Sequence, residues 1–270
     1  MGKKKRRNLF RGLALIILFF FLLASGVAFG VAYSYINTAP PFDPKKLKPS
    51  ETSFVLDEKG KVVSELHGEQ NRIPVSLEEI PDNLKNAFIA IEDQYFYSHK
   101  GINIRSIIGS LITDLIKGGY HRGASTITQQ LVKNAFLTQE KSLKRKIQEA
   151  WLAIQLERHY TKNQILEFYL NQIYFGHSAY GVEAASQLFF GKHVKDLTLA
   201  ECAMLAGVPK GPQYFSPYLN FKNAKERQEL ILDKMAELGY ITKEEAKKAK
   251  DEKIILAGLN TPKANYKAPY

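Results

Sequence analysis

The sequence predicts a mainly α-helical domain with a small N-terminal β-hairpin, carried on a single N-terminal transmembrane helix. Three observations predict this class. An uncharged apolar run extends from Gly12 to Ile36, two short β-prone runs follow it, and apolar residues recur at helical spacing through most of the chain after Pro81. With 45% apolar and 11% aromatic residues, the chain has enough material for a packed core.

The apolar run at the N-terminus predicts a membrane anchor. It is long enough to cross a hydrocarbon core of about 30 Å, which needs roughly 20 helical residues. Basic residues precede it and few follow, so we expect a cytoplasmic tail at 1–11, a membrane helix at 12–36 and everything from about Asn37 outside. A cleaved signal peptide is the alternative, because Ala28 and Gly30 form a small-residue cleavage pattern, but the apolar run continues past them.

The remaining chain predicts a linker, one domain and a C-terminal segment. "NTAPPFDPKKLKPS" carries four prolines, as a stiff linker over 37–52 would. "TSFVLDEKGKVVSEL" reads as a hairpin with its turn near Glu58 to Gly60, and helical segments follow from Pro81. We expect the domain to cover 53–250, with a C-terminal linker at 251–270.

The segment from Ile102 to Ile116 is unusually apolar for one helix. Its apolar residues cover too much of the helix circumference for a single buried face. It is predicted to be a helix enclosed in the core or, alternatively, one that enters the membrane surface.

Charge and motif content exclude several function classes. The net charge of +11 invites a nucleic-acid partner, but an exported, membrane-tethered domain meets lipid headgroups and lipid phosphates instead. We therefore expect an anionic amphiphile as partner and no nucleic acid. The sequence has no P-loop, no dinucleotide-binding glycine pattern and no Cys/His cluster of metal spacing, and its one cysteine, Cys202, is expected in the core.

The stretch "AFIAIEDQYFYSHKG" places a carboxylate among aromatic residues. Phe88, Glu92 and Phe96 fall at i, i+4 and i+8 of a helix, and an apolar setting raises a carboxyl pKa toward the range of a general base or acid. A carboxylate held by a nearby arginine or by backbone donors is the alternative. Asp93 points off this stripe and is expected to bond the following loop, which His99 would help to orient.

Two further helices carry polar faces. In "KSLKRKIQEAW", Lys141, Arg145 and Glu149 recur at i+4, either as a phosphate-binding face or as an exposed ion-pair ladder. A buried stripe is predicted on another face of the same helix: Leu143, Ile147, Trp151 and Ile154. In "GASTITQQLVKN", Ser125, Gln129 and Lys133 share one face, which suits a sugar-phosphate, although serines at a helix start are often only caps.

Together these stretches resemble the peptidoglycan glycosyltransferase family, which polymerises lipid II, either alone or as the transglycosylase module of class A penicillin-binding proteins. "EDQYFYSHKG" is similar to the family's Glu-Asp-x-x-Phe-x-x-His-x-Gly, "GASTITQQLVKN" to its Gly-x-Ser-Thr-Ile-Thr-Gln-Gln-Leu-x-Lys-Asn, and "RKIQE" to its Arg-Lys-x-x-Glu. "ILEFYLNQIYFG" and "AYGVEAASQLFFGK" complete the set in order, so the resemblance covers roughly residues 50 to 245.

The resemblance implies a lysozyme-like helical fold and a role for each matching residue. Glu92 would deprotonate the 4-hydroxyl of an acceptor GlcNAc as it attacks C1 of a donor MurNAc, with inversion, formation of a β-1,4 bond and release of undecaprenyl pyrophosphate. Glu149 would be the second essential carboxylate. The remaining matches would bind the substrate, as cations on the pyrophosphate or as the lining of the sugar-phosphate site: Lys133, Lys141 and Arg145, with Ser125, Thr126 and Gln129.

The resemblance also implies partners and location. These are lipid II and the growing glycan strand, a divalent cation (Mg²⁺ or Mn²⁺) in many members with unknown protein ligands, and no organic cofactor. The location implied is the bacterial inner (cell) membrane, single-pass, with a cytoplasmic N-terminus and a periplasmic or extracellular domain. The ending "NYKAPY" resembles the stretch that enters a transpeptidase domain, so a longer chain is expected.

A lysozyme-like hydrolase or lytic transglycosylase acting on peptidoglycan is the alternative function, because it too needs one buried glutamate. Such an enzyme has no pyrophosphate to hold, so the cations around Lys133 and Arg145 count against it. A non-catalytic anchored scaffold would leave Glu92 among its aromatic neighbours unexplained.

Overall fold

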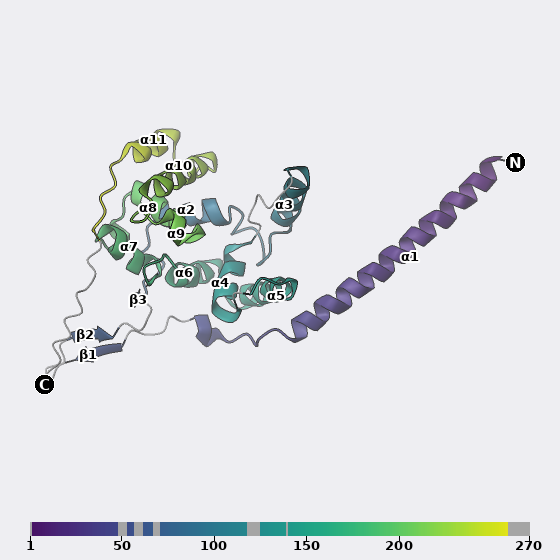
Figure 1. The fold of residues 1–270 in the computed structure, drawn as a ribbon, viewed down its shortest axis with the longest axis horizontal. Coiled ribbons are helices and arrows are strands. Elements are labelled where there is room, and N and C mark those ends of the chain that lie inside the picture. Colours follow the sequence, from purple (N-terminus) through teal and green to yellow (C-terminus); the bar gives the residue numbers. More distant parts are fainter. Residues whose placement is uncertain are drawn as a thin grey trace.

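The structure is a computed structural model that describes residues 2–47, 53–56, 62–66, 71–117, 125–138 and 140–258. Within these residues it is mainly α-helical, as the sequence predicts. Figure 1 shows a body of packed helices from which one long helix projects.

The projecting helix is α1, Gly2–Asn37. Its stretch Gly12–Asn37 is long and apolar enough to cross a membrane, by length and composition, and none of its most apolar window is buried in the body. This agrees with the predicted anchor at 12–36.

The segment after α1 packs onto the body. Gln148 donates from Nε2 to the backbone oxygen of Tyr35 at 3.1 Å and to Oγ1 of Thr38 at 3.2 Å. Further along, Phe42 stacks on Phe136, and Leu47, at the end of the short helix η1 (Pro44–Leu47), is fully buried. The proline-rich segment is therefore part of the packed structure up to residue 47, and it fixes the end of α1 against the body.

Two small sheets accompany the helices. Strands β1 (Ser53–Leu56) and β2 (Val62–Leu66) pair antiparallel, which confirms the predicted hairpin, while its turn lies outside the described residues. Strand β3 (Asn71–Arg72) pairs parallel with β4 (Ala179–Tyr180), a contact that the sequence analysis did not predict.

The body is built from two sets of helices, one packed around α8 and the other formed by α5 and α6 packed on α4. Figure 1 shows α8 beside its neighbours α2 and α10. Their bounds are α2 Asp82–Glu92, α3 Ile104–Lys117, α4 Ile127–Phe136, α5 Leu143–His159, α6 Lys162–Gln172, α7 Val182–Phe190, η2 Val194–Asp196, α8 Leu199–Gly207, η3 Val208–Lys210, α9 Pro212–Phe215, α10 Phe221–Glu237 and α11 Lys243–Asp251.

Apolar composition explains why α8 is central. Every residue of "AECAMLAG" is buried. Half of these residues are alanine or glycine, and their small side chains let α2 and α10 approach α8 closely. Cys202 is fully buried, as predicted, and burial raises the pKa of its thiol. The core continues past residue 250, because Ile254 is buried and the backbone N–H of Ala257 donates to the oxygen of Phe189 at 2.9 Å. Residues 259–270, including most of the expected C-terminal linker, lie outside the described residues.

Helix α3 departs from the favoured sequence prediction. Ile104 is 68% exposed and Ile108 is 52% exposed, so α3 is not an enclosed core helix. Figure 1 places it at the edge of the body. Two large isoleucine side chains one helical turn apart form an exposed apolar face, which favours the alternative prediction of contact with a membrane surface.

A vesicle-binding measurement tests this role of α3. The protein deleted through Ile36 should still bind phospholipid vesicles, because the apolar face of α3 remains. The double substitution Ile104→Ser and Ile108→Ser should weaken the partition into vesicles by at least about tenfold. As a control, Ile255→Ser removes an isoleucine that is 71% exposed on another part of the chain and should change binding little. A deleted protein that ignores vesicles would contradict the prediction.

Candidate active site

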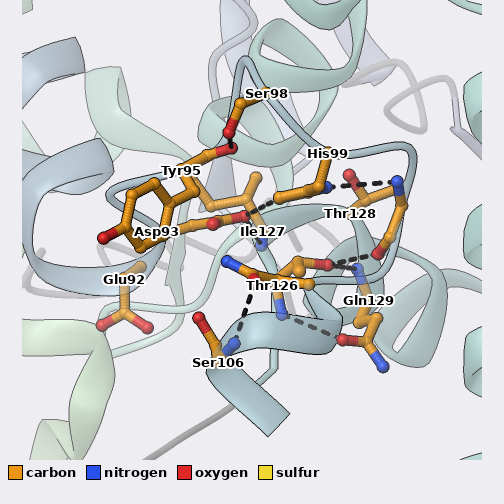
Figure 2. Close-up of polar contacts among 12 residues, drawn as sticks. Glu92, Asp93, Tyr95, Ser98, His99, Ser106, Thr126, Ile127, Thr128 and Gln129 are labelled. Carbon is orange, nitrogen blue, oxygen red and sulfur yellow. Dashed lines mark hydrogen bonds and ion pairs between the residues drawn. The ribbon is translucent and has the colours of Figure 1, made fainter. Parts of the chain in front are cut away.

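Glu92 and Asp93 follow each other at the end of α2 but have different surroundings. Asp93 is the C-cap of α2 and only 6% exposed. Glu92 is half-buried and lines a cavity of about 480 Å³. Its predicted neighbours Phe88 and Phe96 are fully buried, but α2 ends at Glu92, so Phe96 lies in the following turn and not on the helical stripe that the spacing predicts. The Glu92 carboxylate itself reaches the cavity. Figure 2 shows this carboxylate pointing away from the polar cluster around Asp93.

The Asp93 carboxylate orders the loop after α2. Its Oδ2 atom lies 2.7 Å from Nε2 of His99, and Nδ1 of His99 accepts from the backbone N–H of Gly101 at 3.2 Å. Because Nδ1 accepts, the ring hydrogen lies on Nε2, which donates to Asp93. Figure 2 shows these contacts, which confirm the predicted roles of Asp93 and His99 in this loop.

The same carboxylate fixes the start of α4. Oδ2 of Asp93 accepts from the backbone N–H of Ile127 at 3.1 Å. Thr126 is the N-cap, and its Oγ1 donates to the backbone oxygen of Gly101 at 2.7 Å. The end of α2, the loop and the start of α4 are thus joined at one point.

A capping box decides the roles of three predicted residues. The backbone N–H of Gln129 donates to Oγ1 of Thr126 at 3.1 Å, and Oε1 of Gln129 accepts from the N–H of Thr126 at 3.0 Å. Gln129 is 2% exposed and does not line the cavity, whereas Ser125 and Thr126 do. The structure therefore brings Ser125 and Thr126 to the site and places Gln129 beneath it.

The next residue, Gln130, is the glutamine that contacts Glu92. Its Nε2 donates to Oε2 of Glu92 at 2.7 Å. Its Oε1 accepts from the hydroxyl of Tyr169, on α6, at 3.3 Å. The sequence analysis chose Gln129 by helical spacing and missed Gln130. The pair of adjacent glutamines is the signal that could have found it. Because Gln129 stands three residues after Thr126, where a capping box uses it, Gln130 is the glutamine left for the site.

Three cations and one carboxylate gather between α4 and α5: Lys133, Arg145, Lys146 and Glu149. Lys146 donates from Nζ to Oε1 of Glu149 at 2.5 Å and to Oγ of Ser125 at 2.7 Å. Since Ser125 lines the cavity, this group adjoins it.

Electrostatics connects this group to Glu92. Burial lowers the pKa of Lys133, the charge of Glu149 acts against that shift, and the charges of Arg145 and Lys146 add to it. Glu92 also acts on Lys133, in the direction that favours its charged form. Lys133 is thus a partly desolvated cation near both candidate catalytic carboxylates.

Helix α5 begins later than the predicted polar row requires. It starts at Leu143 with Ser142 as N-cap, so Lys141 lies outside the helix, and the i+4 row contains only Arg145 and Glu149. The predicted buried stripe is wrong, because Leu143 is 69% exposed and Ile147, Trp151 and Ile154 are only half-buried. The buried face of α5 instead carries Gln148, Glu149, Leu152, Ala153 and Leu156.

A second group of cations lines the cavity from another part of the body: Lys210 in η3, with Arg227 and Lys234 in α10. Burial lowers the pKa of Arg227, and the charge of Glu92 acts against this shift. Among the described residues, buried Nε of Arg227 has no hydrogen-bond partner. The sequence analysis did not select these residues, although the seven-residue spacing of Arg227 and Lys234 places them on one helix face.

Residues 59–236, more than half of the chain, match the model of the Transglycosylase family. The chain belongs to the transglycosylase family. Its matched region includes both candidate catalytic carboxylates and both groups of cations.

Relatives in the transglycosylase family are penicillin-binding proteins. The chain is 45% identical over 259 residues to penicillin-binding protein 1A of Clostridium tetani, covering 92% of this chain and 33% of that protein. It is 44% identical over 246 residues to penicillin-binding protein 1F of Bacillus subtilis, covering 91% and 34%. The chain therefore spans about a third of the length of these relatives.

A solved structure is also similar to this chain. It is the crystal structure of penicillin-binding protein 1A from Haemophilus influenzae, 30% identical, covering 74% of this chain and 20% of that one. The TM-score is 0.43, which is too low to identify a fold.

Substituting Gly101 tests how closely the loop after α2 must approach α5. Gly101 has φ of +90°, and a Cβ atom there would lie 2.7 Å from the backbone oxygen of Ala153. Both the conformation and the contact exclude a side chain. We expect Gly101→Ala to lower the free energy of unfolding by at least about 2 kcal/mol, measured by chemical denaturation.

Gly109→Ala is the matched control for that measurement. Gly109 lies inside α3, and nothing lies within 4 Å of the position of its added Cβ atom. Alanine is the better helix former, so this variant should be no less stable than the original protein. Equal stability of the two variants would show that the loop tolerates a side chain at residue 101.

Proposed function

We propose that this chain is a peptidoglycan glycosyltransferase that polymerises lipid II into β-1,4-linked glycan strands, with inversion and release of undecaprenyl pyrophosphate. One observation carries the proposal. Glu92, beside the hydrogen-bonded Asp93, lines a cavity that adjoins two separate groups of cations, one from α4 and α5 and one from η3 and α10. A reaction between two molecules that each carry a pyrophosphate needs such an arrangement.

Glu92 is proposed as the general base. The 4-hydroxyl oxygen of the acceptor GlcNAc forms a bond to C1 of the donor MurNAc as the bond from C1 to the pyrophosphate oxygen breaks. The hydroxyl proton goes to the Glu92 carboxylate, and the bonding electron pair leaves with the pyrophosphate. The amide of Gln130 donates to Oε2 of Glu92 and so orients the carboxylate that would accept this proton.

The cations near α4 and α5 are proposed to stabilise the departing pyrophosphate. Lys133 and Arg145 are partly buried, and a cation acts more strongly on developing charge where water is excluded. Lys146 joins this group although the sequence analysis did not select it as a binding residue. Lys141 is exposed and outside α5, so a role for it in phosphate binding rests on the resemblance alone.

The second group of cations is proposed to hold the phosphates of the other substrate molecule. The buried Nε of Arg227, which has no partner among the described residues, is a donor available to an anion. A hydrolase that cleaves finished glycan has no phosphate to bind on either flank of its carboxylate. The lysozyme-like alternative therefore leaves both groups of cations without a role.

A divalent cation remains an expectation from the family resemblance. Among the described residues no group of three His, Cys, Asp or Glu side chains could hold a metal ion, so they do not fit a site made of protein ligands alone. Mg²⁺ usually binds one or two carboxylates together with substrate phosphates. We therefore propose that a metal would come with the pyrophosphate, and no step above requires it.

We propose that α1 anchors the enzyme in the bacterial cell membrane with its N-terminus in the cytoplasm. The anchor's length and the basic residues before Gly12 support this orientation. The exposed apolar face of α3 supports a domain that works at the membrane surface, where lipid II and the growing glycan strand are held.

Replacing the proposed base tests the function directly. Glu92→Gln is nearly isosteric and removes only the titratable group, so lipid II polymerisation should be lost while the melting temperature stays close to that of the original protein. Polymer formation from labelled lipid II in detergent is the measurement. The control, Glu226→Gln, changes an exposed glutamate on α10 and should keep full activity. Polymerisation by Glu92→Gln within a few-fold of the original rate would refute the assignment.

Replacing cations of the α4 and α5 group tests the stabilisation of the leaving pyrophosphate. Lys133→Met and Arg145→Leu should each lower turnover at saturating lipid II by roughly 10²-fold or more, because each removes charge that acts in the transition state. Affinity for lipid II should fall less than turnover. Lys144→Met is the control, since Lys144 is exposed on α5 beside Arg145 and is not among the charges that act on Lys133. Normal turnover with slightly lowered melting temperatures would indicate an ordinary surface ion-pair group instead.

A further inference from the structure

We infer that Tyr169 is a positioning residue that acts through Gln130 to keep the Glu92 carboxylate ionised and aimed at the cavity. This inference rests on the proposed function of Glu92 as a base. Tyr169 itself does not line the cavity. Its influence would pass through two hydrogen bonds that connect the core of the body to the reacting group.

The geometry of the three side chains forms one continuous connection. The Tyr169 hydroxyl donates to Oε1 of Gln130 at 3.3 Å, and Nε2 of Gln130 donates to Oε2 of Glu92 at 2.7 Å. The three residues come from α6, α4 and α2, so the connection crosses three packed helices. Gln130 has no other hydrogen bond in the described part of the chain through its side-chain oxygen or nitrogen.

The chemistry of an amide makes this connection directional. An ionised carboxylate only accepts hydrogen bonds, so it must face the NH₂ group of Gln130. The amide oxygen then faces Tyr169, whose hydroxyl has to donate. If the amide turned over, its oxygen would face the carboxylate and repel it. Tyr169 therefore favours the amide orientation that stabilises ionised Glu92.

Tyr169 is suited to act as a permanent hydrogen-bond donor. It is 1% exposed, and its ring packs edge-on against Phe88 at 5.9 Å, which holds the hydroxyl in place. Burial raises the pKa of Tyr169 well above its ordinary value, and the negative charges of Glu92 and Asp93 act in the same direction. Its phenol consequently keeps its proton at every pH at which a glutamate titrates.

Other charged and titratable groups also face Glu92, and they set the background on which Tyr169 acts. Lys133 and Arg227 interact with its charge, and the remaining groups line the same cavity: Asp93, Tyr95, Arg105, Lys210 and Lys234. None of these is changed by Tyr169→Phe. A difference between that variant and the original protein in the titration of Glu92 therefore reports on the Tyr169–Gln130 connection.

Tyr169→Phe separates this role from simple packing, because it keeps the ring and removes only the hydroxyl. We expect the acid limb of the pH profile of kcat/KM for lipid II polymerisation to move to higher pH by about 0.5 unit or more, the effect of losing one hydrogen bond. At alkaline pH, where Glu92 is ionised in both proteins, the rates should approach each other. A loss of stability or packing would instead lower the rate by the same factor at all pH values.

A second readout does not depend on catalysis. Carboxyl-labelled glutamate allows the full-length protein in detergent micelles to be titrated by carbon NMR, with the Glu92 signal assigned by its absence in Glu92→Gln. The titration midpoint of that signal should rise in Tyr169→Phe by the same amount as the acid limb. If the original protein makes no polymer, the proposed function fails, while the NMR titration still tests the connection.

Two further variants complete the design. Gln130→Met removes both hydrogen bonds at a half-buried position and should raise the midpoint at least as much as Tyr169→Phe. Tyr218→Phe is the matched control, because it removes a phenol hydroxyl that donates to the backbone oxygen of Leu188 at 2.7 Å, outside the cavity. It should leave both readouts unchanged. An unchanged midpoint in Tyr169→Phe, whatever Gln130→Met does, would overturn the inference.

Discussion

The buried carboxylate of Asp93 is the contact on which the candidate site depends. A carboxylate with so little exposure is stable only when hydrogen-bond donors surround it, and here the donors come from His99 and from the first backbone N–H of α4. Satisfying this one group therefore joins the end of α2 to the loop that follows and to the next helix of the site. Because Glu92 is the adjacent residue, its position is set by the same contacts.

Glu92 itself has the opposite character, and the difference explains how adjacent carboxylates can have separate functions. Asp93 is held through one oxygen, Oδ2, by its bonds to His99 and to the backbone N–H of Ile127. Glu92 has one protein donor, Gln130, among the described residues and faces an open, cation-rich cavity. In the proposed reaction Asp93 holds the elements of the site together and Glu92 takes the proton. Cations on both flanks offset the negative charge that two lipid pyrophosphates would bring.

The sequence predicted those features that depend on local periodicity or on contiguous motifs, such as the helical class, the hairpin and the loop roles of Asp93 and His99. The catalytic role of Glu92 stays a prediction. It misassigned residues where the end of a helix overrides its periodicity. Gln129 is drawn into the cap of α4 by Thr126, and Lys141 falls before the N-cap of α5, so neither takes the position that helical spacing gives it. Contacts between distant segments, such as Tyr169 with Gln130 or Arg227 near Glu92, follow only from tertiary packing.

The fastening of α1 to α5 has a consequence for how the protein would meet its surroundings. Gln148, which holds the end of α1, is the neighbour of Glu149, so the contact to the anchor and part of the cation group lie on the same helix, α5. The height of the cavity above a bilayer would then be fixed by the depth at which α1 sits. A thicker or thinner bilayer shifts a helix of fixed apolar length relative to the headgroups. Bilayer thickness would thus determine whether the cavity lies level with the phosphates of the headgroups.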